Sequence, residues 1–377
     1  MPRADVRAAA FALALVAAVG CGAGASPPPT SAAPASPAAA ASHAAPSHPA
    51  ALEITVAYRE AASVFEIVDN ASAWYPDKND AEYREHAVAA LGFGRPEQEL
   101  LDRWIELRRR TSPPAAETGG PLLGRDKPRD ALAACFHAEA DVAAALARVE
   151  AAFGRDAAAA ARAVLEGLSP KLRPVLAEGR DLAPIAAALE AELRQPHVAA
   201  FARRMARFYG APEVPRVTVV FVWWPPVESM TASLAGDTLL MRYHPHKHGE
   251  EARRDVDVVI HELAHLASRR QPEAQKAALS AAFSARCDAA SKLAPARVLE
   301  EPLAVIHQKM FLAETAPARF DRSRSWYGDP WVSAMAKLSF DAAARAHADG
   351  RVLDEALVKA AAKACHELAG AGRALAR

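Results

Sequence analysis

Residues 258–267 carry two histidines and a glutamate in an HExxH pattern, VVIHELAHLA. Four residues along a helix make about 400° of rotation, so His261 and His265 lie on one face, roughly 6 Å apart. Two imidazoles at this spacing can bind one zinc ion, at about 2.0 to 2.1 Å each. Glu262 lies about 100° further round the helix, where it can take a proton from zinc-bound water without binding the metal itself. The sequence therefore predicts a zinc site with a general base beside it.

The residues that fill and flank the motif carry no charge, which places it in the protein interior. Two unpaired imidazoles and a carboxylate are costly to bury without a metal. Two other interpretations stay open: a helix whose histidines are only hydrogen-bonded, and a zinc site without catalysis.

Residues from about 217 to 310 resemble the zincin metallopeptidases, in the order strand, turn, edge strand, HExxH helix and a later helix with an acidic residue. Metzincins extend the motif to HExxHxxGxxH, but Ser268 and Gln271 stand here in place of the glycine and the third histidine. The resemblance is therefore to the gluzincins, whose third ligand is a glutamate on a later helix. It implies peptide-bond hydrolysis, one Zn²⁺ per chain and a peptide or protein substrate.

Residues 299–304, LEEPLA, are similar to the EGLA-type segment that supplies this third ligand in several gluzincin families. The match assigns the ligand to Glu301, with Pro302 where glycine is usual, and Glu300 is the alternative. Proline suits a first helical turn, where the helix dipole favours a carboxylate.

Thermolysin-like proteins carry an aspartate four residues after the ligand glutamate, and Val305 replaces it here. The partner of the other nitrogen of His261 therefore stays open between His307 and Asp341. Gluzincins commonly place a Tyr or His donor beside the zinc for the oxyanion of the transition state. The resemblance makes Tyr327 a candidate for this role, and simple packing of its loop is the alternative.

His244, His246 and His248 alternate just before the HExxH helix. In an extended segment they would face one side and could hold a second metal ion. We expect a solvated loop instead.

The N-terminus resembles the signal peptide and lipobox of a bacterial lipoprotein. Arginines precede an apolar run of 13 residues, Ala8–Gly20, which is too short to span a bilayer. The sequence AVGC then ends on Cys21, which the resemblance makes the acylated first residue of the mature chain. Gly22 in the next position implies the outer membrane of a Gram-negative cell envelope, on its periplasmic or surface side. An ordinary secretory signal cut nearby is the alternative.

The chain has 377 residues with 45 basic and 45 acidic side chains, so it has no broad basic surface and nucleic-acid binding is disfavoured. Hydrophobic residues make up 51% of the chain and aromatic ones only 6%, and much of the apolar fraction is alanine. These values exclude an all-β protein and predict an α+β fold, predominantly helical, with a small β-sheet beside the HExxH helix. The sequence does not indicate an oligomeric state.

Composition divides the chain into four parts. These are a signal peptide (1–20), a disordered Pro/Ala/Ser tether (21–50), a mostly helical N-terminal region (51–210) and a zincin-like metallopeptidase domain (211–377). The predicted strands are Leu52–Ala57, Val217–Trp223 and Thr238–Tyr243, and the predicted helices are about Asp80–Leu91, Pro96–Arg110, Asp130–Phe153, Asp156–Gly167, Asp181–Tyr209 and one from Val258 onward.

Three cysteines follow Cys21, and none of them is in a CxxC spacing. We expect Cys135, Cys287 and Cys365 to be buried as small hydrophobic residues, with one disulfide as the alternative. The leading interpretation is a lipid-anchored zinc metallopeptidase in which Glu262 activates the attacking water. A catalytically inactive zincin-like binding lipoprotein and a helical lipoprotein without metal are the alternatives.

Overall fold

The computed structural model describes residues 53–74, 85, 88–111, 130–211, 213–214, 216–226, 231–252, 254–287 and 296–375. The predicted signal peptide, Cys21, the tether and most of the predicted helix Asp80–Leu91 lie outside these residues. The described residues belong to one compact unit. Its fold is α+β and predominantly helical, as the composition predicts.

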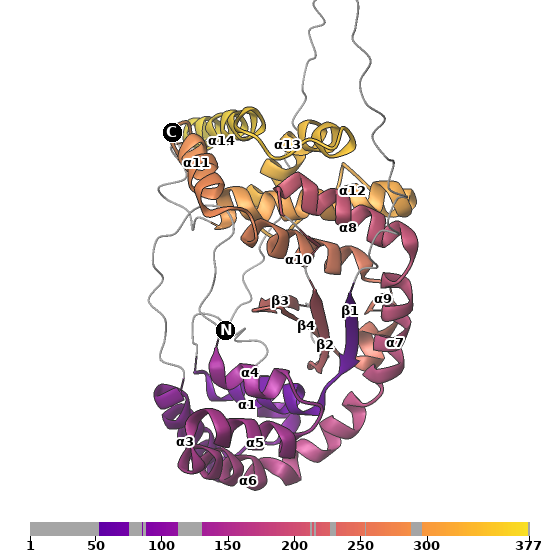
Figure 1. Cartoon of the computed structure of the whole chain (residues 1–377). Coiled ribbons are helices and arrows are strands. Elements are labelled where there is room, and N and C mark those ends of the chain that lie inside the picture. The colour runs from indigo at the N-terminus through magenta and orange to yellow at the C-terminus, as the bar shows by residue number, and fades with distance from the viewer. Residues whose placement is uncertain are drawn as a thin grey trace, which may run out of the picture. The chain divides into compact units, whose positions relative to one another are not determined.

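Four strands form one sheet: β1 (Ile54–Tyr58), β2 (Val217–Trp223), β3 (Thr231–Ala235) and β4 (Thr238–Tyr243). Their order is β1-β2-β4-β3, with β1, β2 and β4 parallel and β3 antiparallel to β4 (Figure 1). Two of the predicted strands have the bounds of β2 and β4. The prediction missed β3, because Ala and Ser give its sequence little strand propensity.

Helices lie on both faces of the sheet (Figure 1). One group is α1 (Glu60–Ser72), α3 (Arg95–Thr111), α4 (Ala131–His137), α5 (Val142–Phe153) and α6 (Arg155–Gly179). The other is α7 (Leu182–Leu193), α8 (Pro196–Tyr209), α9 (Pro245–Ala252), α10 (Val256–Arg269), α11 (Glu273–Ser284), α12 (Glu301–Thr315), α13 (Pro330–Ala348) and α14 (Glu355–Leu375). A π-helix, η2 (Ala296–Glu300), precedes α12, and a short 3-10 helix, η3 (Pro317–Arg319), follows it.

Alternate residues of β2 serve different hydrophobic cores. Val219 and Phe221 join the core beneath α8, α10 and α12, whereas Val220 and Val222 pack on the opposite side with Ala62 of α1. This alternation is the two-residue period of a strand, and burial on both faces explains the nearly continuous apolar sequence of β2. Residues before and after position 210 contribute to the same larger core. The predicted boundary between two domains at this position stays a prediction.

Two predicted helices are wrong because each is interrupted. The predicted helix Asp130–Phe153 is α4 and α5: Asp130 caps α4, and Asp141 caps α5 by accepting a hydrogen bond from the backbone N–H of Ala144. The predicted helix Asp181–Tyr209 is α7 and α8, because Pro196 begins a new helix rather than continuing the first.

The cysteine prediction is also wrong in part. Cys287 and Cys365 form a disulfide that joins the end of α11 to α14, whereas Cys135 is buried as a free thiol. The two partners are 78 residues apart, so their approach depends on tertiary packing.

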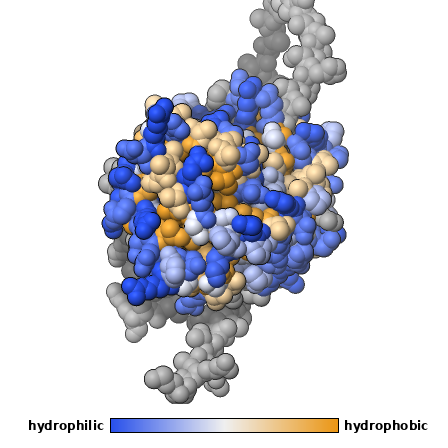
Figure 2. Space-filling model, turned by 90° about the horizontal axis from the view of Figure 1, so that it is seen from below, coloured by the Kyte–Doolittle hydropathy of each residue, from blue (hydrophilic) through white to orange (hydrophobic). Residues whose placement is uncertain are grey.

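The face that α3, α5 and α6 form is covered by hydrophilic side chains with small hydrophobic areas between them (Figure 2). In the part of the chain that the structure describes, no helix has both the length and the apolar character needed to cross a membrane.

A buried ionic cluster holds the helices of the α1 side together. The guanidinium of Arg108 is fully buried, with Nε 2.8 Å from Asp69 Oδ1 and Nη1 2.9 Å from Asp130 Oδ1. One turn earlier in α1, Glu66 Oε2 accepts hydrogen bonds of 2.9 and 2.7 Å from Arg242 of β4, and its Oε1 lies 3.1 Å from His137 Nε2. The cluster therefore ties α1 to α3, to α4 and to the sheet.

We predict that Arg108→Ala lowers the free energy of unfolding by about 3 kcal/mol, because it leaves the partly buried carboxylates of Asp69 and Asp130 without their cation. Arg109→Ala is the matched control: its pair with Glu106 is exposed, so the loss should stay below about 1 kcal/mol. Urea unfolding followed by circular dichroism measures both. Equal losses for the two variants would contradict the stabilising role of the cluster.

Candidate metal centre

Helices α10 and α12 position the side chains of the predicted metal site. Helix α10 is buried on nearly all sides, and His261, Glu262 and His265 are each less than a tenth exposed. Helix α12 packs along α10 and begins at Glu301, with Pro302 in its first turn as the sequence predicts. The chain thus brings a carboxylate from a separate helix to the histidine face of α10.

Ligand atoms of three residues converge between these helices. His261 Nε2 lies 3.0 Å from Glu301 Oε1, His265 Nε2 lies 3.4 Å from Glu301 Oε2, and the two Nε2 atoms are 3.2 Å apart. Among the described residues, this is the one group of three or more His, Cys, Asp or Glu side chains gathered closely enough to hold a metal ion. It contains the three residues that the sequence analysis named as ligands.

The spacing of these atoms fits a small metal ion. Ligands at about 2.0 to 2.1 Å from a tetrahedral zinc ion are about 3.3 to 3.4 Å from one another. The three observed separations, 3.0, 3.2 and 3.4 Å, are close to that value. Two imidazole nitrogens and a carboxylate are also the donor set of catalytic zinc sites, in which the fourth position is open.

Glu300, the alternative third ligand, lies on the other edge of the His265 ring. Its Oε1 is 2.8 Å from His265 Nδ1, the nitrogen that points away from His261 and Glu301. Glu300 is 5% exposed, and it is the last residue of the π-helix η2. The sequence suggests Glu300 only as an alternative metal ligand. Its contact with His265 Nδ1 was not predicted, although two consecutive glutamates are a visible signal.

The charges in the site act strongly on one another. Burial by itself lowers the pKa of His265, but its hydrogen bonds to Glu300 and Glu301 outweigh this and raise the pKa to about 10. Burial favours the neutral form of Glu301, yet the two histidines hold its pKa well below the usual range. Glu300 and Glu301 therefore stabilise positive charge on His265, and the same negative charge would stabilise a metal cation bound between these residues.

Tyr327 lies beside the site. Its ring stacks on that of His261 with 6.3 Å between centroids and 9° between planes, and the residue is 38% exposed. The neighbouring Trp326 anchors the loop, because its backbone N–H donates to Ser333 Oγ at 3.0 Å and its indole N–H donates to the carbonyl of Asp321 at 2.9 Å. The structure thus brings Tyr327 to the centre, and its role as an oxyanion donor stays a prediction.

Neither residue suggested as a partner for the second nitrogen of His261 contacts it. His307 Nδ1 lies 2.9 Å from the carbonyl of Leu303, and Asp341 accepts a hydrogen bond from Arg322 at the surface. His261 Nδ1 has no hydrogen-bond partner among the described residues.

The predicted loop at His244, His246 and His248 is wrong, because residues 245–252 form helix α9. His244 Nε2 lies 3.2 Å from Glu178 Oε1, and His248 is buried. The extended arrangement needed for a second metal ion on three aligned imidazoles is therefore not formed.

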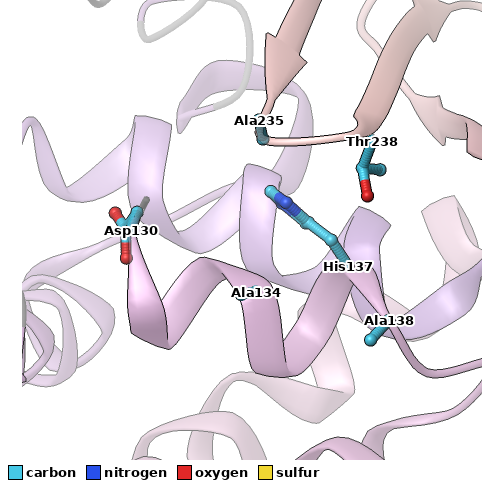
Figure 3. Close-up of a pocket in the computed structure, with 6 residues that line it drawn as sticks. All are labelled: Asp130, Ala134, His137, Ala138, Ala235 and Thr238. Atoms are coloured by element: carbon cyan, nitrogen blue, oxygen red, sulfur yellow. The ribbon is translucent and has the colours of Figure 1, made fainter. Parts of the chain in front are cut away.

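A separate cavity of about 20 Å³ lies beneath the turn between β3 and β4 (Figure 3). A volume of this size admits about one water molecule. It contains no residue of the metal centre. Its lining residues are Asp130, Ala134, His137, Ala138, Ala235 and Thr238.

No protein-family model, no curated protein and no solved structure matches this chain. Its function is therefore argued from the residues of the centre and their geometry.

We predict that the protein binds one Zn²⁺ per chain and that His265→Ala loses it, since two remaining protein ligands rarely suffice. His244→Ala is the matched control, because this histidine also contacts a glutamate but lies outside the centre. Metal content after dialysis, measured by plasma mass spectrometry, distinguishes the two variants. Full zinc occupancy in His265→Ala would refute the site.

Proposed function

We propose that the protein is a zinc metallopeptidase that is held in a bacterial cell envelope by an N-terminal lipid. The observation that carries the proposal is the convergence of His261, His265 and Glu301, with Glu262 next to His261 on the same buried helix. A metal-binding group with a carboxylate beside it can activate water for the hydrolysis of an amide.

Zinc is the metal that this donor set favours, with His261, His265 and Glu301 as ligands. A bound zinc ion would act as a Lewis acid that polarises the substrate carbonyl and makes an attacking water more acidic. Catalytic zinc sites use three protein ligands, so these residues would leave such an ion accessible to water and substrate.

Glu262 serves as the general base. It takes a proton from the attacking water as the water oxygen bonds to the peptide carbon. The C–N bond then breaks, and Glu262 passes this proton to the departing amine nitrogen. Tyr327, whose ring stacks on that of His261, is the candidate to donate a hydrogen bond to the oxyanion that forms on the carbonyl oxygen.

The edge strand β3 supports a peptide as the substrate. It is the last strand of the sheet on the side of β4, and it contacts α10, the helix that carries the motif. An extended peptide can add to a sheet edge through backbone hydrogen bonds, which read the peptide chain rather than one side chain.

The disulfide supports a location in the cell envelope. Structural disulfides persist in oxidising compartments such as the periplasm and are rare in the cytosol. The Cys287–Cys365 bond agrees in this respect with the signal peptide and lipid anchor at Cys21 that the sequence predicts.

The mechanism predicts that Glu262→Gln retains zinc and the fold but loses about 10² to 10⁴ in turnover, because an amide cannot accept the proton. Glu301→Gln should instead weaken zinc binding, since a neutral oxygen replaces a charged ligand. Cleavage of a broad peptide library, with metal content measured on the same samples, tests both variants. If Glu262→Gln cleaves as fast as the parent while both hold zinc, the chain is better described as an inactive zincin-like binding lipoprotein.

The anchor predicts that Cys21→Ser moves the protein from the membrane fraction to the soluble fraction, because the thiol that accepts the lipid is removed. Cys135→Ser, which changes the buried free thiol, should stay with the membrane. Immunoblots of fractionated cells measure the distribution. Membrane attachment of correctly cleaved Cys21→Ser protein would show that another anchor exists.

A further inference from the structure

Glu300 and Glu301 hold opposite edges of one imidazole. Glu300 Oε1 lies 2.8 Å from His265 Nδ1, and Glu301 Oε2 lies 3.4 Å from His265 Nε2. Both contacts are enclosed, because the side chains of Glu300 and Glu301 are only 6% and 17% exposed. His265 therefore lies in a clamp of two carboxylates.

A regular α-helix does not readily provide this arrangement, because consecutive side chains point about 100° apart around its axis. Glu300 instead ends the π-helix Ala296–Glu300, and Glu301 begins the α-helix that follows. A π-turn contains one residue more than an α-turn, and such turns often occur at functional sites. The change of helix type between the two glutamates lets both reach the same ring.

The contact with Glu300 decides which nitrogen of His265 carries the proton. An ionised carboxylate only accepts hydrogen bonds, so His265 Nδ1 must donate. Metal binding requires a neutral imidazole, which carries one proton, so a proton on Nδ1 leaves the lone pair on Nε2. That nitrogen faces His261 and Glu301, where the ligand atoms converge.

His261 is held in a different way. Its Nδ1 has no hydrogen-bond partner within the described residues, and its ring stacks on Tyr327. Among the described residues, a carboxylate therefore contacts the Nδ1 edge of His265 but not the Nδ1 edge of His261. Loss of this carboxylate should change His265 and leave His261 as it was.

Resting on the proposed metal site, we infer that Glu300 is a positioning residue that fixes His265 with its proton on Nδ1 and so presents Nε2 to the metal. The π-turn at Ala296–Glu300 is what brings Glu300 into this place. Glu300 also supplies a second negative charge, so that the two glutamates together balance a divalent cation.

The test compares zinc affinity in Glu300→Gln and Glu300→Leu with the parent, by competition with a chromophoric chelator. Glutamine keeps an acceptor without the charge, and leucine removes the acceptor. We expect one zinc per chain throughout, with the dissociation constant raised about 10- to 100-fold by Gln and further by Leu. A role in packing alone would not produce this order, since leucine fills the buried space as well as glutamine does.

Proton placement gives a readout that is independent of affinity. In zinc-loaded protein with ¹⁵N-labelled histidine, two-bond ¹H–¹⁵N spectra should show a slowly exchanging proton on Nδ1 of His265 in the parent, and this proton should exchange rapidly in Glu300→Leu, which removes its acceptor. The matched control is Glu178→Gln, which alters a glutamate–histidine contact with His244 outside the centre and should leave zinc affinity unchanged. If Glu300→Leu fails to fold by circular dichroism, the zinc affinity of Glu300→Gln carries the test, because this variant removes the charge alone.

Parent affinity and an unchanged His265 proton in the folded variants would overturn the role of Glu300 while leaving the metal site intact. A parent chain that binds no zinc would instead refute the proposed function. The two failures are therefore distinguishable.

Discussion

Two buried carboxylates facing one imidazole are the constraint on which the metal centre depends. Glu300 and Glu301 contact histidines in the described part of the chain, and no fixed cation lies among their contacts there. Buried negative charge of this kind must be balanced. In the metal-free protein, a proton on His265 balances part of it, which explains the raised pKa of that residue. A divalent cation between the same atoms would balance both charges.

The carboxylates of the ionic cluster on the other face of the sheet are paired differently from Glu300 and Glu301. There, Asp69 and Asp130 share Arg108, and Glu66 is paired with Arg242. Each carboxylate thus has a permanent cation supplied by the chain, so this cluster is built for stability. The candidate metal centre also contains carboxylates of low exposure, but imidazoles lie where the ionic cluster has guanidinium groups. Paired with arginines, the carboxylates of the first cluster hold helices together. Paired with histidines, Glu301 belongs to a group that could hold an exchangeable cation.

Two further histidines, His307 and His347, pack in the core behind α12, and both have lowered pKa values. Burial, with the nearby His347, lowers the pKa of His307 to about 3, and burial beside Arg204 and Arg207 lowers that of His347 to about 4. Both histidines are therefore neutral at physiological pH, and they pack with the rings of Phe208 and Tyr209 as aromatic residues. By contrast, the hydrogen bonds to Glu300 and Glu301 raise the pKa of His265.

Local sequence alone determined the parts of this protein that depend on periodicity. The four-residue spacing placed His261 and His265 on one face of a helix, and strand propensity gave the bounds of β2 and β4. The segment around Glu301 was found through its similarity to a known motif, and the structure brings that residue to both histidines. Tertiary structure decided the contact of Glu300 with His265, the antiparallel pairing of β3 with β4, and the pairing of Cys287 with Cys365. These features depend on where α12, β4 and α14 pack, and contacts between residues distant in the chain have no periodic signature in the sequence.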